Sequence, residues 1–282
     1  MILLARPAAV EILDAQRRGA GGVETSLDLG RSRSRLGLEA GAVRLPDGQR
    51  LAVDALGEAV ENPDSVFTVI DGALEKVTWF SGETGRVYTL RATDGWPALE
   101  ISGILMHRIK GTDPRADAES KIAAVAPVRG RVLETCMGLG YTAIQAARTA
   151  DHVTVFEIDP NVIDMARLNP YSAPLFAEGT NVEIRSGDVA EAVADVPDGL
   201  FDVIIHDPPT LAIAGELYAT GFYRELLRLL RRGGKLFHYT GDPGSRYRKQ
   251  DLPGRVAQRL GEVGFTSVRR EPAALGVSAR KR

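Results

Sequence analysis

A glycine-bearing turn in the middle of the chain carries the strongest chemical signal in the sequence. The apolar run Val132-Leu133 ends in the carboxylate of Glu134, and Gly138 and Gly140 follow within a few residues. Glycines in a turn from a strand to a helix let the backbone approach a ligand where a Cβ atom would collide. A tight turn without a ligand produces the same pattern, so this turn alone does not identify a site.

Two later acidic residues strengthen the indication of an adenosine-containing ligand. Glu157 ends the next apolar run, seventeen residues after Gly140. A carboxylate there can accept hydrogen bonds from both hydroxyls of a ribose. Asp188 follows a third apolar run, and its carboxylate can either take up an adenine amino group or cap a helix that begins at Val189. The two roles of Asp188 are compatible, and both stay open.

The fourth apolar run ends in His206-Asp207-Pro208-Pro209-Thr210. Two prolines remove two backbone N–H donors and stiffen the turn, which leaves carbonyl groups and the Asp207 carboxylate at the edge of the sheet. Such a set of acceptors suits holding the N–H or O–H group of a nucleophile. A purely structural turn is the alternative interpretation.

The elements that must position these residues alternate between strands and helices. Strands are predicted over 131–134, 153–157, 182–184, 202–206 and 235–239, and helices over 116–126 and 222–230. This alternation predicts an α/β fold with a parallel sheet that is covered on both faces. In such a sheet the ligand lies outside the carboxyl ends of the strands, where the strand order reverses. We assign this domain to residues 111–282.

Residues 1–110 predict a small, mostly-β N-terminal domain. Turn residues at 45–48, 70–72 and 82–85 separate short extended runs and indicate hairpins. The run 74–80 is expected to form one strand, and 52–60 a short helix. The character of the sequence changes near 111–114.

The four sites resemble, in order and spacing, those of the class I S-adenosylmethionine-dependent methyltransferases. The resemblance covers roughly residues 112–282 and implies a Rossmann-like seven-stranded sheet whose last strand runs antiparallel, with 265–270 and 275–279 as the final pair. It also implies S-adenosyl-L-methionine as the cofactor. The expected cofactor-binding residues are Glu134, Cys136, Gly138, Gly140, Tyr141, Thr142, Glu157, Ile158, Asp188, Val189 and Asp207. We expect Asp207, Pro208 and His206 to be the catalytic residues.

A narrower resemblance links the segments 101–108, 136–142, 206–209 and 238–241 to a little-characterised group of predicted archaeal-type methyltransferases near the spermidine synthases. Two positions depart from the wider pattern. Cys136 replaces the usual first glycine of the cofactor loop. Thr210 replaces the aromatic residue that stacks on a base in amino-directed enzymes, and Tyr218, Phe222 or Tyr239 is the candidate substitute.

The histidines allow more than one interpretation. His206 and His238 end adjacent strands at the ligand edge, and His107 precedes the catalytic domain. A metal site or a histidine base is conceivable, but histidines satisfied by local hydrogen bonds are favoured, and no metal is expected. Cys136 should lie in the cofactor loop, which argues against a covalent mechanism through a thiolate.

The composition is that of an ordinary soluble protein, with 282 residues of which 44% are hydrophobic and 26% charged. The single cysteine excludes an internal disulfide and a multi-thiolate zinc site, and it fits a reducing cytoplasm. No apolar stretch approaches the roughly 20 residues of a membrane span. The apolar start of the chain breaks at Pro7, too early for a signal peptide core. We expect a cytoplasmic protein without a membrane partner.

The net charge of −2 conceals basic clusters at 31–35, 246–259 and 280–282. We expect RNA contacts through Arg246, Arg248 and Lys249, although a solvated loop and a frayed tail explain such clusters equally well. The favoured function is methylation of a nitrogen or oxygen of an RNA. A small-molecule methyltransferase, a spermidine-synthase-like aminopropyltransferase and a non-enzymatic adenosine-binding module are the alternatives. The oligomeric state stays open, a homodimer included.

Overall fold

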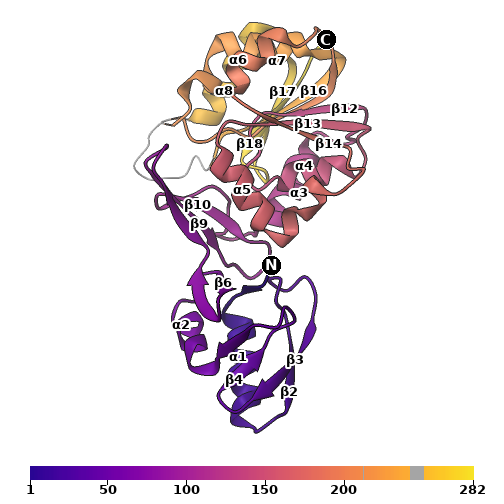
Figure 1. Ribbon diagram of the computed structural model, residues 1–282. Helices are drawn as coiled ribbons and strands as arrows, with labels where there is room; N and C mark the ends of the chain where they lie inside the picture. Colours follow the sequence, from indigo (N-terminus) through magenta and orange to yellow (C-terminus); the bar gives the residue numbers. More distant parts are fainter. Residues whose placement is uncertain (212, 242–250) are drawn as a thin grey trace. The chain divides into compact units, whose positions relative to one another are not determined.

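The computed structural model describes residues 1–211, 213–241 and 251–282 (Figure 1). The contacts of the chain divide it into two compact units. The first comprises Met1–Pro114 with Arg167–Tyr171, and the second Arg115–Ala166 with Ser172–Arg282. The predicted RNA contacts Arg246, Arg248 and Lys249 lie outside the described residues.

A seven-stranded sheet forms the centre of the second unit. Its strands are β12 (Arg131–Glu134), β13 (His152–Glu157), β14 (Val182–Ser186), β15 (Phe201–His206), β16 (Leu230–Tyr239), β17 (Thr266–Glu271) and β18 (Gly276–Arg280). The order is β14-β13-β12-β15-β16-β18-β17, with β18 antiparallel to both neighbours and the other pairs parallel. The predicted Rossmann-like sheet with an antiparallel last strand is therefore confirmed. The strand order reverses between β12 and β15, which places the expected ligand site at the carboxyl ends of these strands.

Helices cover this sheet, and Figure 1 groups α3, α4 and α5 apart from α6, α7 and α8. They are α3 (Pro114–Ala124), α4 (Tyr141–Ala147), α5 (Pro160–Leu168), α6 (Val189–Ala192), α7 (Thr220–Leu229) and α8 (Leu252–Val263), with short 3₁₀ turns at Pro170–Phe176, Val193–Asp195 and Gly215–Tyr218. Helix α7 buries Phe222, Tyr223, Leu226 and Leu229, the helical spacing that the sequence predicted. These side chains pack in one core with Leu236 and other residues of the sheet. Each buried leucine contributes roughly 1.5–3 kcal/mol.

The first unit is β-rich and contains three antiparallel sheets. Its strands are β1 (Leu3–Leu4), β2 (Gly22–Thr25), β3 (Ser34–Glu39), β4 (Ala42–Arg44), β5 (Arg50–Ala52), β6 (Phe67–Ile70), β7 (Ala73–Lys76), β8 (Thr78–Ser81), β9 (Arg86–Arg91), β10 (Ala98–Ile101) and β11 (Ile104–Leu105). The predicted hairpins are confirmed, as is the short helix, formed by a 3₁₀ turn at Val53–Ala55 and α2 (Leu56–Glu61). Helix α1 (Arg6–Arg17) was not predicted, although Pro7 in its first turn is a recognisable start signal.

The expectation of one strand over 74–80 is wrong, because the chain changes sheets at Val77. Strand β7 pairs with β6, whereas β8 pairs with β9. The N–H of Val77 donates to the carbonyl of Val66, and its own carbonyl accepts from the N–H of Leu90. A continuous run of strand-forming residues cannot reveal that its two halves have different partners.

The frayed tail, which the sequence allowed as an alternative explanation of the last basic cluster, is not observed. Arg280 ends β18, and the Nζ of Lys281 donates to the carbonyls of Arg228 and Leu230 at 3.2 and 2.7 Å. Over the described part of the chain, no helix combines the length and the apolar character that crossing a membrane requires.

Candidate active site

The carboxyl ends of β12, β13 and β15 bring the predicted cofactor residues to one edge of the sheet. Glu134 ends β12 and is 1% exposed. Its Oε2 atom has no hydrogen-bond partner among the described residues. Burial, together with the charges of Asp207 and Glu157, raises the pKa of Glu134 well above its usual range. A buried carboxylate with an unpaired oxygen is suited to bind a cationic group of a ligand.

The loop after Glu134 needs glycine for its conformation and for its packing. Gly138 and Gly140 have φ values of +55° and +71°, in the region that favours glycine. A Cβ atom on Gly140 would collide with the side chain of Leu175. Tyr141 and Thr142 begin α4 and are buried. The loop therefore exposes backbone to a ligand at the start of a helix.

Cys136 stands in this loop, as expected from the sequence. It is a free cysteine, and burial raises the pKa of its thiol well above the usual value. A thiol in this state is a poor nucleophile, because the thiolate is the reactive form.

Glu157 ends β13 and faces the glycine loop. Its Oε2 accepts the N–H of Gly138 at 3.2 Å, and its Oε1 accepts the N–H of Asp159 at 3.0 Å. Burial raises its pKa to about 7. Ile158, the next residue, is 64% exposed and offers an apolar surface beside this carboxylate. The predicted contact of Glu157 with a ribose stays a prediction.

Asp188 directly precedes α6 as its N-cap residue, and its carboxylate accepts the N–H of Ala190 at 2.8 Å. This bond confirms the capping role that the sequence allowed. Val189 is buried directly after it. The contact of Asp188 with an adenine stays a prediction.

Asp207 is held by a lysine that the sequence did not reveal. The Nζ of Lys121 on α3 lies 2.6 Å from Asp207 Oδ2 and 2.8 Å from Asp117 Oδ2. Side-chain exposures are 9% for Lys121, 5% for Asp117 and 20% for Asp207. The same Nζ lies 4.6 Å from the ring centroid of Tyr239. One cation thus joins the predicted catalytic carboxylate to a second carboxylate on α3.

The protonation states in this group follow from burial and charge. Burial lowers the pKa of Lys121, but the carboxylates of Asp207 and Asp117 outweigh this and hold the pKa above its usual value. The pKa of Asp207 is raised above its usual value, because burial outweighs the opposing effect of Lys121. Lys121 therefore keeps its charge at neutral pH and pairs with the Asp207 carboxyl group. The available sequence signal was a lysine four residues after an aspartate on an otherwise alanine-rich helix.

His206, a predicted catalytic residue, lies beneath the edge rather than at its surface. It is 0% exposed, its Nδ1 accepts from the hydroxyl of Thr135 at 2.7 Å, and its Nε2 donates to the carbonyl of Leu217 at 3.0 Å. Burial and the neighbouring His238 lower its pKa well below the usual value, so the ring is neutral. Contact between His206 and a substrate would require the ring to leave both partners.

His238 is satisfied in the same way. Its Nδ1 donates to the carbonyl of Tyr239 at 2.7 Å, and its Nε2 accepts from the hydroxyl of Tyr223 at 2.8 Å. His107 belongs to the first unit, where its Nδ1 accepts the N–H of Leu99 at 3.2 Å. Among the residues that the structure describes, no group of three or more histidine, cysteine or acidic side chains could hold a metal ion.

The candidate substitutes for the missing aromatic ring behave differently from one another. Tyr218 and Phe222 are 2% and 6% exposed and belong to the core, so they cannot stack on a base. The hydroxyl of Tyr218 donates to the carbonyl of Pro209 at 3.0 Å and stabilises the turn after β15. Tyr239 alone of the three is half-buried and lies beside Lys121.

The residues at this edge fit S-adenosylmethionine. Glu134 would offer its unpaired carboxyl oxygen to the amino group of the cofactor, and the glycine loop would present backbone to its methionine moiety. Glu157 would offer acceptors for the ribose, and Ile158 would offer an apolar surface for the adenine. The predicted contact of Asp207 with the cofactor stays a prediction, and its carboxylate stands at the end of the neighbouring strand β15.

Comparisons with known proteins agree with this geometry. A model described as a methyltransferase domain matches residues 132–234. The uncharacterized protein MJ1233 of Methanocaldococcus jannaschii is 40% identical over 278 residues, which cover 97% of this chain and 93% of the relative.

Solved structures show the same fold. A spermidine synthase in complex with the transition state analogue AdoDATO matches with a TM-score of 0.59 at 20% identity, over 76% of this chain and 78% of that one. The spermidine synthase of Thermotoga maritima matches with a TM-score of 0.57 at 20% identity, over 76% and 77%. At this identity the likeness concerns the fold alone. The chain belongs to the family of MJ1233 and, through the domain at 132–234, is an S-adenosylmethionine-dependent methyltransferase.

Proposed function

We propose that the protein methylates a nitrogen or oxygen atom of an RNA, with Asp207 and Pro208 as the residues that hold the acceptor. The observation that carries this proposal is the Asp207 carboxylate at the end of β15, at the same edge as the predicted cofactor-binding residues and paired with Lys121. A partly buried acceptor at this point can bind the N–H or O–H group of a nucleophile. The Asp-Pro-Pro turn and the basic clusters of the sequence favour RNA over a small metabolite.

The cofactor, when bound, supplies an electrophilic methyl group on a sulfonium sulfur. The protein then has to align the nucleophile with that methyl group. Lys121 occupies Asp207 Oδ2, so Oδ1 is the oxygen that accepts the hydrogen of the nucleophile. The carbonyl of Pro208 is a second acceptor on the same rigid turn. Together they orient the lone pair of the nucleophile.

Asp207 also has the chemistry to receive the proton that the nucleophile releases. Burial raises the pKa of Asp207 above its usual value and so makes the carboxylate a stronger base, and Lys121 offsets this effect only in part. Asp207 can therefore both position the nucleophile and accept its proton.

Variants of Asp207 separate these roles. Asp207→Ala should retain cofactor affinity and lower turnover, by roughly 10²–10⁴-fold if Asp207 is the base. Asp207→Asn keeps an acceptor oxygen, so a mild loss in this variant with a severe loss in alanine indicates positioning. Asp198→Asn, an exposed aspartate that precedes β15 at its opposite end, is the matched control. Normal turnover in both Asp207 variants would contradict the assignment.

The substrate class is tested with methyl-labelled cofactor in a cell extract. Label in the RNA fraction supports the proposal, whereas label confined to small metabolites contradicts it. Transfer from decarboxylated cofactor to a diamine, in preference to methyl transfer, would identify an aminopropyltransferase. Cofactor binding without any labelled product would identify a non-enzymatic module.

A further inference from the structure

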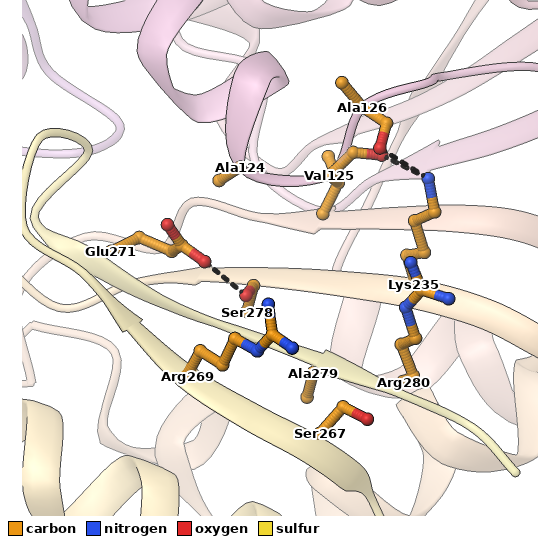
Figure 2. A pocket seen from close by; sticks show the side chains of 10 residues that line it. All are labelled: Ala124, Val125, Ala126, Lys235, Ser267, Arg269, Glu271, Ser278, Ala279 and Arg280. Carbon is orange, nitrogen blue, oxygen red and sulfur yellow. Dashed lines mark hydrogen bonds between the residues drawn. The ribbon is translucent and has the colours of Figure 1, made fainter.

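A hollow with a volume of about 390 Å³ lies on the antiparallel side of the large sheet. One wall is the end of α3 with the residues that follow it, and the floor is formed by β16, β18 and β17 (Figure 2). Leu236 and Val277 face the core beneath α7 and α8, so the alternate residues of their strands face the hollow. The charged and hydroxyl side chains that line it are Lys235, Ser267, Arg269, Glu271, Ser278 and Arg280.

Three cations of the hollow occupy neighbouring positions on adjacent strands. Lys235 on β16 is directly opposite Arg280 on β18. Arg269 on β17 is opposite Ser278 and therefore diagonal to Arg280. Like charges directly opposite each other destabilise a sheet. Burial and the charge of Arg280 both lower the pKa of Lys235, and the effect of Arg280 reflects repulsion between the two cations.

The described residues neutralise the positive charge of Lys235, Arg269 and Arg280 only in part. The Nζ of Lys235 donates to the carbonyls of Val125, Ala126 and Pro127 at 2.9, 2.8 and 3.0 Å, and two of these carbonyls are visible in Figure 2. Glu271, the one carboxylate of the lining, accepts from the Ser278 hydroxyl at 2.6 Å. The side chains of Arg269 and Arg280 form no hydrogen bond or ion pair with any residue of the described ranges.

A bulge in β17 places Arg269 in the hollow. Thr266 pairs with Arg280 and Arg269 pairs with Ser278, so Ser267 and Val268 together oppose the single residue between them on β18. Ser267 has a φ of +51°, a conformation that serine rarely adopts. Relative to Thr266, the extra residue shifts the alternation of the strand, so that Ser267, Arg269 and Glu271 line the hollow and Val268 packs against the core. Bulges of this kind re-aim a side chain and recur next to functional sites.

We propose that Arg269 and Arg280, backed by Lys235, form a binding site for a phosphate group, and that this group belongs to the backbone of the RNA substrate. The assignment to RNA rests on the proposed function. The planar guanidinium group binds phosphate through two parallel hydrogen bonds, and two arginines with free donors provide such contacts. An anion between the three cations also removes the repulsion that the sheet otherwise contains.

The hollow is within reach of the active site along β16. Tyr239, which lies beside Lys121, is the last residue of β16, and Lys235 precedes it by four residues on the same strand. Four residues of a strand span roughly 13 Å. A phosphate in the hollow therefore belongs to a nucleotide near the methylated one, not to that nucleotide itself.

The experiment compares Arg269→Gln, Arg280→Gln and the double variant with the wild type. Arg232→Gln is the matched control, because this exposed arginine lies on β16 and does not line the hollow. Without ligand, Arg280→Gln should melt at the same temperature as the wild type or higher, since repulsion with Lys235 is removed. In the double variant, affinity for an oligoribonucleotide should fall at least tenfold. The slope of log affinity against log salt should fall by about one unit for each arginine.

A second arm uses pyrophosphate, which has the same chemistry without a nucleic acid. It should raise the melting temperature of the wild type and of Arg232→Gln, but not that of the double variant. Equal RNA affinity, equal salt dependence and equal pyrophosphate response in the double variant and the control would overturn the site, even if RNA is methylated. A pyrophosphate response that depends on both arginines, in a protein that neither binds nor methylates RNA, would support the phosphate site and overturn its assignment to RNA together with the proposed function.

Discussion

Replacing Glu157 by glutamine tests the cofactor site through stability and affinity, which should change in opposite directions. The folded-state pKa of Glu157 is about 7, against an ordinary value of 4.5, because the carboxylate is buried. Between pH 4.5 and pH 7, the folded protein thus retains a proton on Glu157 that the unfolded chain has released. The contribution of this proton to the stability of the folded state is complete below pH 4.5 and is lost as the pH rises through 7.

The size of this loss follows from the two pKa values. Their difference of about 2.5 corresponds to about 3.5 kcal/mol, at about 1.4 kcal/mol for each pKa unit. Glutamine does not titrate, so Glu157→Gln should lack this decline. Its amide group meets one of the two N–H donors that the carboxylate now binds, and this imposes a cost of about 1–3 kcal/mol that does not vary with pH. The change with pH, rather than stability at a single pH, is therefore the informative quantity.

Urea unfolding at pH 5 and pH 8 measures the effect. Relative to the wild type, Glu157→Gln should become more stable by about 2.5 kcal/mol between these two values. Calorimetry should show the opposite for the cofactor, with affinity at pH 8 at least tenfold lower in the variant, because a charge-assisted hydrogen bond to the ribose contributes about 1.5–3 kcal/mol. Wild-type affinity should also fall below pH 7, as the carboxylate becomes protonated.

Two results would refute this reasoning. Equal pH dependence of stability in the variant and the wild type would mean that Glu157 is ionised throughout. Unchanged cofactor affinity in the variant would place the ribose elsewhere. Glu178→Gln, which changes an exposed glutamate to the same residue, controls for the loss of one negative charge.

Three further predictions concern groups that hold the site. Lys121→Met should destabilise the protein by about 3–5 kcal/mol in urea unfolding, because two carboxylates lose their shared cation. The variant should also raise the pKa of Asp207 and so move the acidic limb of the turnover–pH profile to higher pH. An acidic limb at the wild-type pH would contradict the ion pair. Gly140→Ala should cost about 2–5 kcal/mol from its positive φ and the collision with Leu175, measured by thermal unfolding with Gly261→Ala, whose Cβ meets nothing, as control. Tyr223→Phe should cost about 1–3 kcal/mol, because the Nε2 of buried His238 loses its donor, and equal stability would disprove that bond.

Local sequence patterns were sufficient to predict the α/β fold of the second unit. The spacing of apolar residues identified the strands from β12 to β16 and helix α7. This spacing depends only on the directions in which successive side chains point along a strand or a helix, so it can be read from the local sequence. The turn residues after the strands predicted that the acceptor and the cofactor bind at one edge of the sheet, for the same reason. Parallel strands then bring their carboxyl ends together, whichever order they adopt, so Glu134, Glu157 and Asp207 could be grouped before the structure.

Contacts between distant parts of the chain were decided by the tertiary structure alone. Lys121 and Asp207 are 86 positions apart, and nothing local marks this lysine as the partner of that carboxylate. The change of sheet at Val77 and the bulge at Ser267 depend on which strand lies alongside, as does the burial of Tyr218. A residue's type and spacing determine its local conformation and the face on which it lies. Which charge, ring or strand then meets that face is a property of the folded packing, because it is set by neighbours far away in the sequence.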